Sequence, residues 1–327
     1  MVNKKEKQKK VSILLAIYNP NKIWLEELLC SLETQTYENI CINAIDDCSS
    51  SISLEDLRII FEKNLSKLEW KLSRNKHNIG SNATFELLTK QAEGDYFAYC
   101  DQDDIWKENK IETLVDLIKK SNSVLVYSDM YVINKYGKLV SNSICNIEKR
   151  TFRRGADLIG YLAVGNFITG CTMLVESKIA KKSIPFVNYI FHDYWISIIA
   201  SLNGNIDYTN EALVFYRLHD KNQSANLGRV YTKKDYIKER IIDVQNRCED
   251  IHKKMKDYNK KDDYIYTNFY KWVKSRYNYI LKINYIDFRT ILKYRNFGEK
   301  TVLLEIFLPF LPEYVFECII NLRKNIK

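Results

Sequence analysis

The chain lacks the closely spaced cysteine pairs that zinc sites and disulfide frameworks usually contain. It holds eight cysteines, but no two of them form a CxxC pair. Several lie inside apolar runs, where a free cysteine behaves as a small buried hydrophobic residue. We therefore expect neither structural zinc nor disulfides.

The sequence also lacks a long uninterrupted apolar stretch. A membrane-spanning helix needs roughly 18 such residues, and no run here reaches that length. The lysine-rich start is followed by VSILLAIYNP, whose apolar run is broken after about seven residues, so the core of a signal peptide is missing. These absences predict a cytoplasmic protein.

Two glycine-rich phosphate-binding motifs are missing as well. There is no Walker A loop, and no GxGxxG follows the first expected strand. Both P-loop NTPases and dinucleotide dehydrogenases are therefore disfavoured. No internal repeats or low-complexity linkers occur either.

What is present is an alternation of buried strands and amphipathic helices over roughly the first 134 of the 327 residues. Short connections between such elements predict βαβ units, hence an α/β fold with a mostly parallel sheet flanked by helices. The pattern predicts strands over 11–18, 40–46, 68–75, 95–100 and 123–134, and helices over 23–35, 54–64, 81–94 and 107–121, with Gly94 as a helix C-cap.

Two acidic clusters follow expected strands, Asp46-Asp47 and Asp101/Asp103/Asp104. Ligands of open α/β sheets bind at the carboxyl ends of the strands. Carboxylates brought together there repel one another unless a cation compensates, and Mg²⁺ or Mn²⁺ bound together with a diphosphate would do so. Taken singly, the first cluster is equally typical of a turn or an N-cap, and the second of a helix start.

Several segments in order resemble the family-2 glycosyltransferases with the GT-A fold. They are VSILLAIYNP, ICINAIDDCSS, NIGSNATFE and EGDYFAYCDQDDIW, and the similarity covers residues 11–228. The forms DQDDIW, FHDYWIS (191–197) and YRLHDKNQS (216–224) resemble most the rhamnosyltransferase-type branch, which builds bacterial capsule, O-antigen and cell-wall polysaccharides. The resemblance implies an inverting transfer of a sugar from a dTDP- or UDP-sugar, with dTDP-L-rhamnose one candidate, to a lipid-linked or oligosaccharide acceptor.

The same resemblance implies a donor-nucleotide site near the first two strands. Tyr18 and Asn19 match the residues that end the first strand beside the nucleotide. Asp46 matches the aspartate that bonds the base, and Asp47 supports the same loop.

It further implies a metal and a catalytic base. Asp101 and Asp103 match the DxD motif, with Asp103 as the expected direct ligand of Mg²⁺ or Mn²⁺. His219 would ligate the metal as neutral imidazole, and Arg217 would pair with phosphate. Asp193 matches the residue that serves as general base. Taken alone, it is also consistent with a structural salt link to His192. Trp106 and Trp195 are expected to be packing residues first.

Residues 229–327 are expected to form a mainly helical C-terminal region behind the catalytic domain of residues 1–228. Residues 229–300 carry 19 Lys and Arg against 10 Asp and Glu, interleaved with tyrosines. No nucleic-acid motif appears, so nucleic acid is not an expected partner. A solvated helical surface is one interpretation, and contact with an anionic membrane is the other.

The stretch 301–320 is apolar but is interrupted by charges and prolines, namely Glu305, Glu313, Glu317, Pro309 and Pro312. It could lie in a membrane interface, which predicts peripheral association. The alternative is that it packs on the catalytic domain or forms a dimer.

Two further hypotheses remain open from sequence. One is a non-catalytic nucleotide-sugar-binding scaffold of a polysaccharide assembly complex, which would have no need of the set Asp46, Asp101, Asp103, Asp193 and His219. The other is a nucleotidyltransferase, whose product contains a new pyrophosphate bond instead of a glycoside.

Overall fold

The computed structural model describes residues 8–148, 150–156, 158–220, 230–257, 264–298 and 301–325. The chain forms two compact units, one of Met1–Leu158 with Phe167–Asp220 and one of Ile159–Asn166 with Lys221–Lys327. The short segment Ile159–Asn166 thus belongs to the second unit, whereas the sequence led us to place all of residues 1–228 in one domain.

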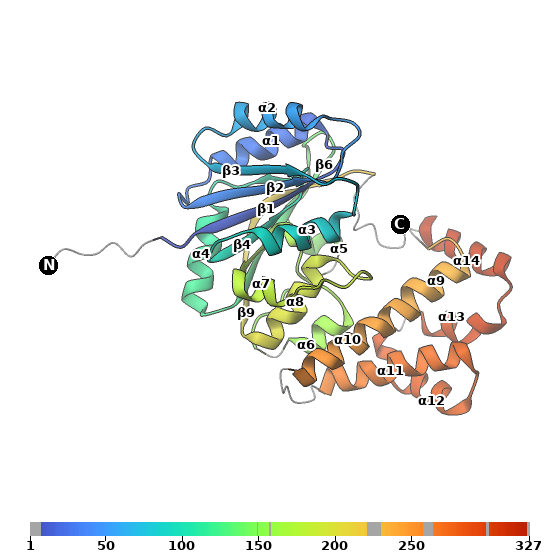
Figure 1. Ribbon diagram of the computed structural model, residues 1–327. Coiled ribbons are helices and arrows are strands. Elements are labelled where there is room, and N and C mark those ends of the chain that lie inside the picture. Colours follow the sequence, from blue (N-terminus) through green and yellow to red (C-terminus); the bar gives the residue numbers. More distant parts are fainter. Residues whose placement is uncertain are drawn as a thin grey trace. The chain divides into compact units, whose positions relative to one another are not determined.

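The first unit is built around one mixed sheet (Figure 1), whose strand order is β3-β2-β1-β4-β8-β6-β9-β5, with β7 paired to β6. Its strands are β1 (Val11–Ile17), β2 (Ile40–Asp46), β3 (Glu69–Arg74), β4 (Tyr96–Cys100), β5 (Ile105–Trp106), β6 (Leu125–Asn134), β7 (Leu139–Ser141), β8 (Met173–Glu176) and β9 (Ile206–Leu218). β1 to β4 are parallel, and β6 is parallel to β9. The predicted mostly parallel sheet flanked by helices is confirmed.

Helices cover both faces of this sheet. In Figure 1, α1 and α2 lie on one face and α3, α7 and α8 on the other. The helices are α1 (Lys22–Glu33), α2 (Leu54–Asn64), α3 (Ser81–Gln91), α4 (Lys110–Ser121), α5 (Cys145–Glu148), α7 (Ser177–Lys182) and α8 (His192–Asn203), with a 3₁₀ turn η1 (Gly170–Thr172). Leucines and isoleucines of α1, α2 and α4 share one core cluster with β1 and β2.

Burial explains the strand order. The β-branched run of β1 is almost wholly buried, as expected for a central strand with helices on both faces. In contrast, β3 alternates exposed and half-buried residues, because it is the edge of the sheet.

The register brings the carboxyl ends of the first strands together. Ile17 pairs with Asp46, Asp46 with Arg74, and Leu15 with Cys100. The loops that follow β1, β2 and β4 therefore start at one edge of the sheet, which is where an open α/β sheet binds ligands.

The prediction that Gly94 caps a helix is wrong. α3 ends at Gln91, and its C-cap is Ala92 in an extended conformation. Gly94 instead lies against β1: a Cβ added there would be 3.2 Å from the carbonyl oxygen of Lys10 and 3.2 Å from Ser12 Oγ. The glycine is needed because two backbones approach closely, not because a helix ends.

The described part of the second unit is helical, as expected. It contains α6 (Ile159–Val164), α9 (Lys233–Tyr236), the π-helix η2 (Ile237–Ile242), α10 (Asp243–Asp257), α11 (Tyr264–Leu281), α12 (Tyr285–Lys293), η3 (Arg295–Phe297), α13 (Val302–Phe307), η4 (Leu308–Phe310) and α14 (Glu313–Asn325). Among the described residues, no helix is both long and apolar enough to cross a membrane.

Candidate active site

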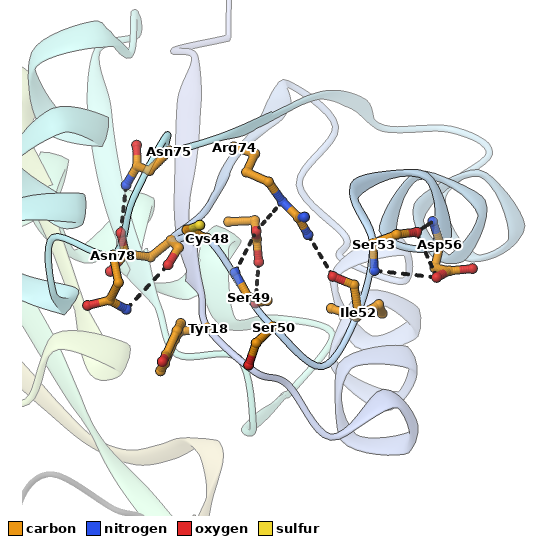
Figure 2. Close-up of polar contacts among 12 residues, drawn as sticks. Tyr18, Cys48, Ser49, Ser50, Ile52, Ser53, Asp56, Arg74, Asn75 and Asn78 are labelled. Atoms are coloured by element: carbon orange, nitrogen blue, oxygen red, sulfur yellow. Dashed lines mark hydrogen bonds and ion pairs between the residues drawn. The ribbon is translucent and has the colours of Figure 1, made fainter.

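Asp46 ends β2 as a completely buried carboxylate. Its Oδ2 lies 2.6 Å from Arg74 Nε and accepts the Ser49 backbone N–H at 3.1 Å, and its Oδ1 accepts the Ser49 hydroxyl. Arg74 also donates to the Ile52 carbonyl, and its side chain points toward the loop that carries Ser49 and Ile52 (Figure 2). The Asp46 carboxylate therefore holds the loop after β2 in place. To bond a nucleotide base, as expected from the sequence, it would have to give up its hydrogen bonds with Ser49.

This ion pair carries the first prediction. Replacing Arg74 with methionine should lower the free energy of unfolding by about 3 kcal/mol, because it leaves a buried carboxylate without its cation. Urea denaturation measures the change. Arg58→Met is the control, since Arg58 and its partner Glu55 are both exposed; equal losses in the two variants would contradict the assignment.

Asp47, also buried, ties the same loop to the start of α3. Its carboxylate accepts Asn75 Nδ2 at 2.8 Å and the backbone N–H groups of Ile79 and Gly80 at 2.9 and 2.8 Å. Asn78 donates to the Asp47 carbonyl (Figure 2). These bonds are those of a turn, and the nucleotide-binding role expected of Asp46 and Asp47 stays a prediction.

Tyr18 and Asn19 continue from the end of β1 into this corner. The side-chain amide of Gln102 binds both backbone groups of Tyr18. Its Oε1 accepts the Tyr18 N–H at 2.9 Å, and its Nε2 donates to the Tyr18 carbonyl at 3.0 Å. The Asn19 side chain accepts the backbone N–H groups of Ser50 and Ser51, and its φ of 42° is one that asparagine tolerates. The Tyr18 ring is left exposed.

The DQDD turn joins β4 to β5, and α4 begins only at Lys110. The helix-start interpretation of Asp101, Asp103 and Asp104 is therefore wrong. Asp104 points inward: it is completely buried, and its Oδ1 accepts the Arg217 backbone N–H at 3.0 Å. Its Oδ2 has no hydrogen-bond partner among the described residues.

Asp103 is the more accessible of these two carboxylates, and it meets His219 from the end of β9. His219 Nε2 lies 2.6 Å from Asp103 Oδ2, and the two side chains are 11% and 18% exposed. The imidazole also lies beside Trp24, with ring centroids 5.0 Å apart. The structure thus brings together two of the three predicted metal ligands.

Arg217 is buried, and its guanidinium already binds two other residues of the chain. Its Nε donates to the Asp103 carbonyl at 2.9 Å, and its Nη2 lies 2.6 Å from Glu27 Oε2. The expected phosphate contact would require Arg217 to leave Glu27. In this conformation the guanidinium fixes the DQDD turn against α1. Residues 221–224 of the same motif lie outside the described residues.

The Asp101 carboxyl is surrounded by other negative charges. Burial, followed by the charges of Asp103 and Asp193, raises the pKa of the Asp101 carboxyl to about 7. Like charges held together in this way favour protonation unless a cation is supplied. The predicted base therefore acts electrostatically on one carboxylate of the DxD motif, Asp101.

Asp193 stands in the first turn of α8 with its side chain partly exposed. Its Oδ2 accepts the Gly170 N–H at 2.9 Å, and burial raises the pKa of the carboxyl to about 6. The salt-link alternative fails, because His192 stacks on Phe85 and burial lowers the pKa of its imidazole to about 3, which keeps it neutral.

The donor set fits a hard divalent cation. It consists of carboxylate oxygens and one imidazole, burial and the charge of Asp103 raise the pKa of Asp101, and one buried Asp104 oxygen has no hydrogen-bond partner among the described residues. Within the described residues, a carboxylate oxygen of Asp101, one of Asp104 and Cys171 Sγ lie within 4.8 Å of one another. Asp101 and the Asp103–His219 pair do not form such a group.

Three residues of this corner were missed by sequence reasoning, namely Trp24, Glu27 and Gln102. Trp24 and Glu27 lie on α1, and in the sequence they look like ordinary helix residues. The structure shows that Arg217 of β9 contacts both of them. The position of Gln102 between two aspartates of the DxD motif was a weak indication that it belongs to the site. Trp106 and Trp195 are buried packing residues, as predicted.

A surface hollow of about 720 Å³ lies at the opposite, amino edge of the sheet. Charged side chains of Lys10, Glu69 and Asp95 line it. None of the predicted site residues borders it, so it is not the site described above.

Comparison with known proteins decides the family. The Glycosyl transferase family 2 model matches residues 12–181, just over half of the chain. The chain belongs to glycosyl transferase family 2. The match spans β1 to α7 and includes the Asp46–Asp47 loop and the DQDD turn.

Relatives of this family-2 chain agree with the assignment. It is 27% identical over 229 residues to an uncharacterized glycosyltransferase of Haemophilus influenzae, covering 66% of this chain and 67% of the relative. It is 26% identical over 216 residues to one of Rickettsia typhi, covering 64% of each chain. It is 28% identical over 222 residues to an Escherichia coli protein, UDP-Glc:alpha-D-GlcNAc-diphosphoundecaprenol beta-1,3-glucosyltransferase WfgD, covering 66% of this chain and 80% of the relative.

Solved structures show the same fold. The crystal structure of S. aureus TarS 1-349 in complex with UDP-GlcNAc superimposes with a TM-score of 0.55 at 16% identity, covering 90% of this chain and 82% of that one. The predicted GT-A fold with a helical C-terminal region is confirmed.

Proposed function

We propose that this protein is an inverting, metal-dependent glycosyltransferase that moves a sugar from a nucleotide diphosphate to a saccharide acceptor. The observation that carries the proposal is the half-buried Asp193, whose carboxyl has its pKa raised by burial to about 6 and whose charge acts on Asp101 of the DxD motif. A scaffold protein has no need of a base poised in this way.

In the proposed reaction, Asp193 takes the proton of an acceptor hydroxyl while that oxygen bonds to the anomeric carbon. The bond from this carbon to the diphosphate oxygen breaks, and the nucleoside diphosphate leaves with the electron pair. Attack from the face opposite the leaving group inverts the anomeric centre. The N–H of Gly170 holds the carboxylate in place.

Mg²⁺ or Mn²⁺ would be held by Asp103 and Asp101, with His219 as a further ligand, and would neutralise the charge of the leaving diphosphate. Asp103 is our choice of direct ligand over Asp104, because Asp104 is completely buried and occupied by the Arg217 N–H. Tyr18, Asn19, Asp46 and Asp47 would form the nucleotide corner, with Asp46 reaching the base after Ser49 releases it and Arg217 reaching phosphate.

We further propose a lipid-linked acceptor in bacterial surface-polysaccharide synthesis on the cytoplasmic side of the membrane. WfgD, by its name, uses UDP-Glc and a diphosphoundecaprenol-linked sugar. The donor is a UDP- or dTDP-sugar, with dTDP-L-rhamnose proposed from the DQDDIW form of the motif.

A thermal-shift screen of UDP- and dTDP-sugars with and without Mn²⁺ tests this function. A ligand that binds only the native state raises the melting temperature, and at about 100 times its Kd it adds about 2.7 kcal/mol. We expect a shift that needs both the nucleotide-sugar and the metal. A flat screen, or a shift produced equally well without metal, would contradict the proposal.

The C-terminal unit offers a surface for a membrane. Leu303 and Phe307 of α13, Phe310 of η4 and Tyr314 of α14 are all exposed. Glu305, which interrupts this apolar stretch in the sequence, points inward and binds Arg276 through two close contacts. Of the charges that interrupt this stretch in the sequence, Glu305 is therefore not on the surface, and the exposed apolar residues support peripheral binding to an anionic bilayer.

Replacing both Leu303 and Phe307 with serine should weaken binding to phosphatidylglycerol-containing vesicles by about tenfold or more, because each buried apolar side chain contributes roughly 1.5–3 kcal/mol. Vesicle co-sedimentation measures the affinity. Ile59→Ser, at an exposed site on α2, is the control. Unchanged vesicle binding in the double variant, or no binding by the native protein, would sink the proposal.

A further inference from the structure

The end of β9 carries two of the predicted site residues, Arg217 and His219, and both of their side chains contact Trp24 of α1. Arg217 Cζ lies 5.1 Å from the centroid of the Trp24 ring. The His219 imidazole lies beside the same indole, with ring centroids 5.0 Å apart and an angle of 38° between the ring planes. Because side chains two positions apart along an extended chain point to the same side, one aromatic side chain can contact both.

Trp24 lies outside the face of α1 that packs into the core. The buried residues of this helix are Leu25, Leu28, Leu29, Ser31 and Leu32. Trp24 itself is half-buried, and its N–H donates to the side chain of the N-cap residue Asn21 at 3.3 Å. The backbone that carries the indole is therefore fixed at the start of the helix, and the ring meets the end of β9 from a fixed position.

A second contact from α1 holds the same end of β9. Glu27 follows Trp24 by three positions, which makes the two side chains neighbours on the helix surface. Glu27 Oε2 lies 2.6 Å from Arg217 Nη2, and the Arg217 side chain is only 2% exposed. A charge-assisted bond of this kind to a buried guanidinium fixes its geometry. The end of β9 is thus held to α1 by an aromatic face and by a carboxylate.

These contacts lead to Asp103 of the DQDD turn. Arg217 Nε donates to the Asp103 carbonyl at 2.9 Å, and His219 Nε2 lies 2.6 Å from Asp103 Oδ2. An imidazole can rotate about its side-chain bonds, so its neighbours decide which way its two nitrogens face. Contact with the Trp24 indole restricts this rotation from the side of α1.

We propose that Trp24 is a positioning residue of the predicted metal site, whose indole holds the His219 imidazole so that Nε2 faces the Asp103 carboxylate before metal or donor arrives. Trp24 acts through His219 and needs no contact with either ligand. This role rests on the proposed metal-dependent function, which assigns Asp103 and His219 to the metal. Loss of a group that orients a metal-binding side chain lowers metal affinity by roughly 10–100-fold.

Calorimetry of Mn²⁺ binding in the presence of UDP tests the proposal. Trp24→Leu keeps an apolar helix-forming residue but removes the aromatic face, and it should weaken Mn²⁺ binding by about tenfold or more. Trp24→Phe keeps a ring beside His219 and should retain most of the native affinity. Trp70→Leu is the matched control, because Trp70 is also half-buried in the first unit but packs on Phe61.

Native Mn²⁺ affinity in Trp24→Leu overturns the proposal. Equal losses in Trp24→Leu and Trp24→Phe also overturn it, because the aromatic face would then have no special role. A loss of the same size in Trp70→Leu overturns it as well, since it would follow from weakened packing anywhere in the unit.

A reaction in EDTA separates the positioning role from the metal dependence. Diethyl pyrocarbonate modifies imidazole nitrogens, and mass spectrometry measures the rate at each histidine. His219 should react severalfold faster in Trp24→Leu than in the native protein or in Trp24→Phe, while the exposed His77 reacts equally in all three. An unchanged rate at His219 overturns the positioning role. If the native protein binds no Mn²⁺, the proposed metal dependence fails, and this reaction still decides whether Trp24 holds His219.

Discussion

Replacing Asp193 with asparagine should lower the rate of sugar transfer by about a thousandfold or more while the nucleotide-sugar still binds. General-base catalysis contributes roughly 10²–10⁴-fold, and an amide cannot take the acceptor proton. The amide oxygen can still accept the Gly170 N–H, and the bond from the Tyr194 N–H is the one that is lost. Initial rates and calorimetric donor affinity, measured on the same protein, separate the two effects.

The pH dependence of the native enzyme should report the same carboxyl. Transfer requires the deprotonated form of Asp193, whose pKa burial raises to about 6. The rate at saturating donor should therefore rise as the pH increases through about 6 and then level off. An enzyme whose rate is flat across this range uses a different base.

Glu211→Gln, at an exposed position at some distance along the chain, is the matched loss of a carboxylate and should leave the rate unchanged. Full activity in Asp193→Asn would falsify the base assignment. Loss of donor binding in that variant would assign Asp193 to the donor site instead.

Replacing Asp103 with asparagine should remove most of the Mn²⁺-dependent gain in donor affinity, by roughly a hundredfold or more. Losing only a hydrogen-bond partner of a metal ligand costs roughly 10–100-fold, and here the charged ligand itself is lost. Asparagine can still hydrogen-bond His219, so the change is chiefly one of charge. Calorimetric titration of donor with and without Mn²⁺ measures the difference.

Asp116→Asn, on the exposed face of α4, controls for the loss of one negative charge. The prediction for Asp103 is contradicted if the variant keeps the native affinity with Mn²⁺. It is also contradicted if affinity falls equally with and without the metal, because the carboxylate then acts on the donor directly.

Sequence periodicity was sufficient for the first half of the fold because most of those strands, the edge strand β3 excepted, are buried on both faces and the helices between them are amphipathic. The register of β1 with β2 and β4 then brings Asp46-Asp47 and the DQDD turn to one edge, as expected from parallel strands. Gly94 misled us, since the close approach of Lys10 and Ser12 leaves no local pattern in the sequence.

The partners of the site residues could not be predicted, because they come from distant segments. Arg217 of β9 reaches Glu27 of α1, 190 positions away, and His219 reaches Asp103, 116 positions away. A motif identifies which residue type occurs at a position, but not which of its atoms are already bound. Asp46 illustrates the point: the sequence suggests an available carboxylate, and the structure encloses it with Arg74 and Ser49.

The same limit applied to the C-terminal stretch. Glu305 looks like a charge that interrupts an apolar surface, yet it accepts the Tyr236 hydroxyl and binds Arg276 inside the second unit. A buried ion pair in a helical unit cannot be read from spacing alone, because it depends on how α11 and α13 pack.

Product analysis tests the central claim most directly. The purified protein would be given Mn²⁺, the nucleotide-sugar identified by the screen and a lipid-linked saccharide, and NMR of the product would define the bond formed. The account predicts a glycoside whose anomeric configuration is opposite to that of the donor, together with release of the nucleoside diphosphate. A retained anomeric configuration, or a new pyrophosphate bond in place of a glycoside, would contradict it.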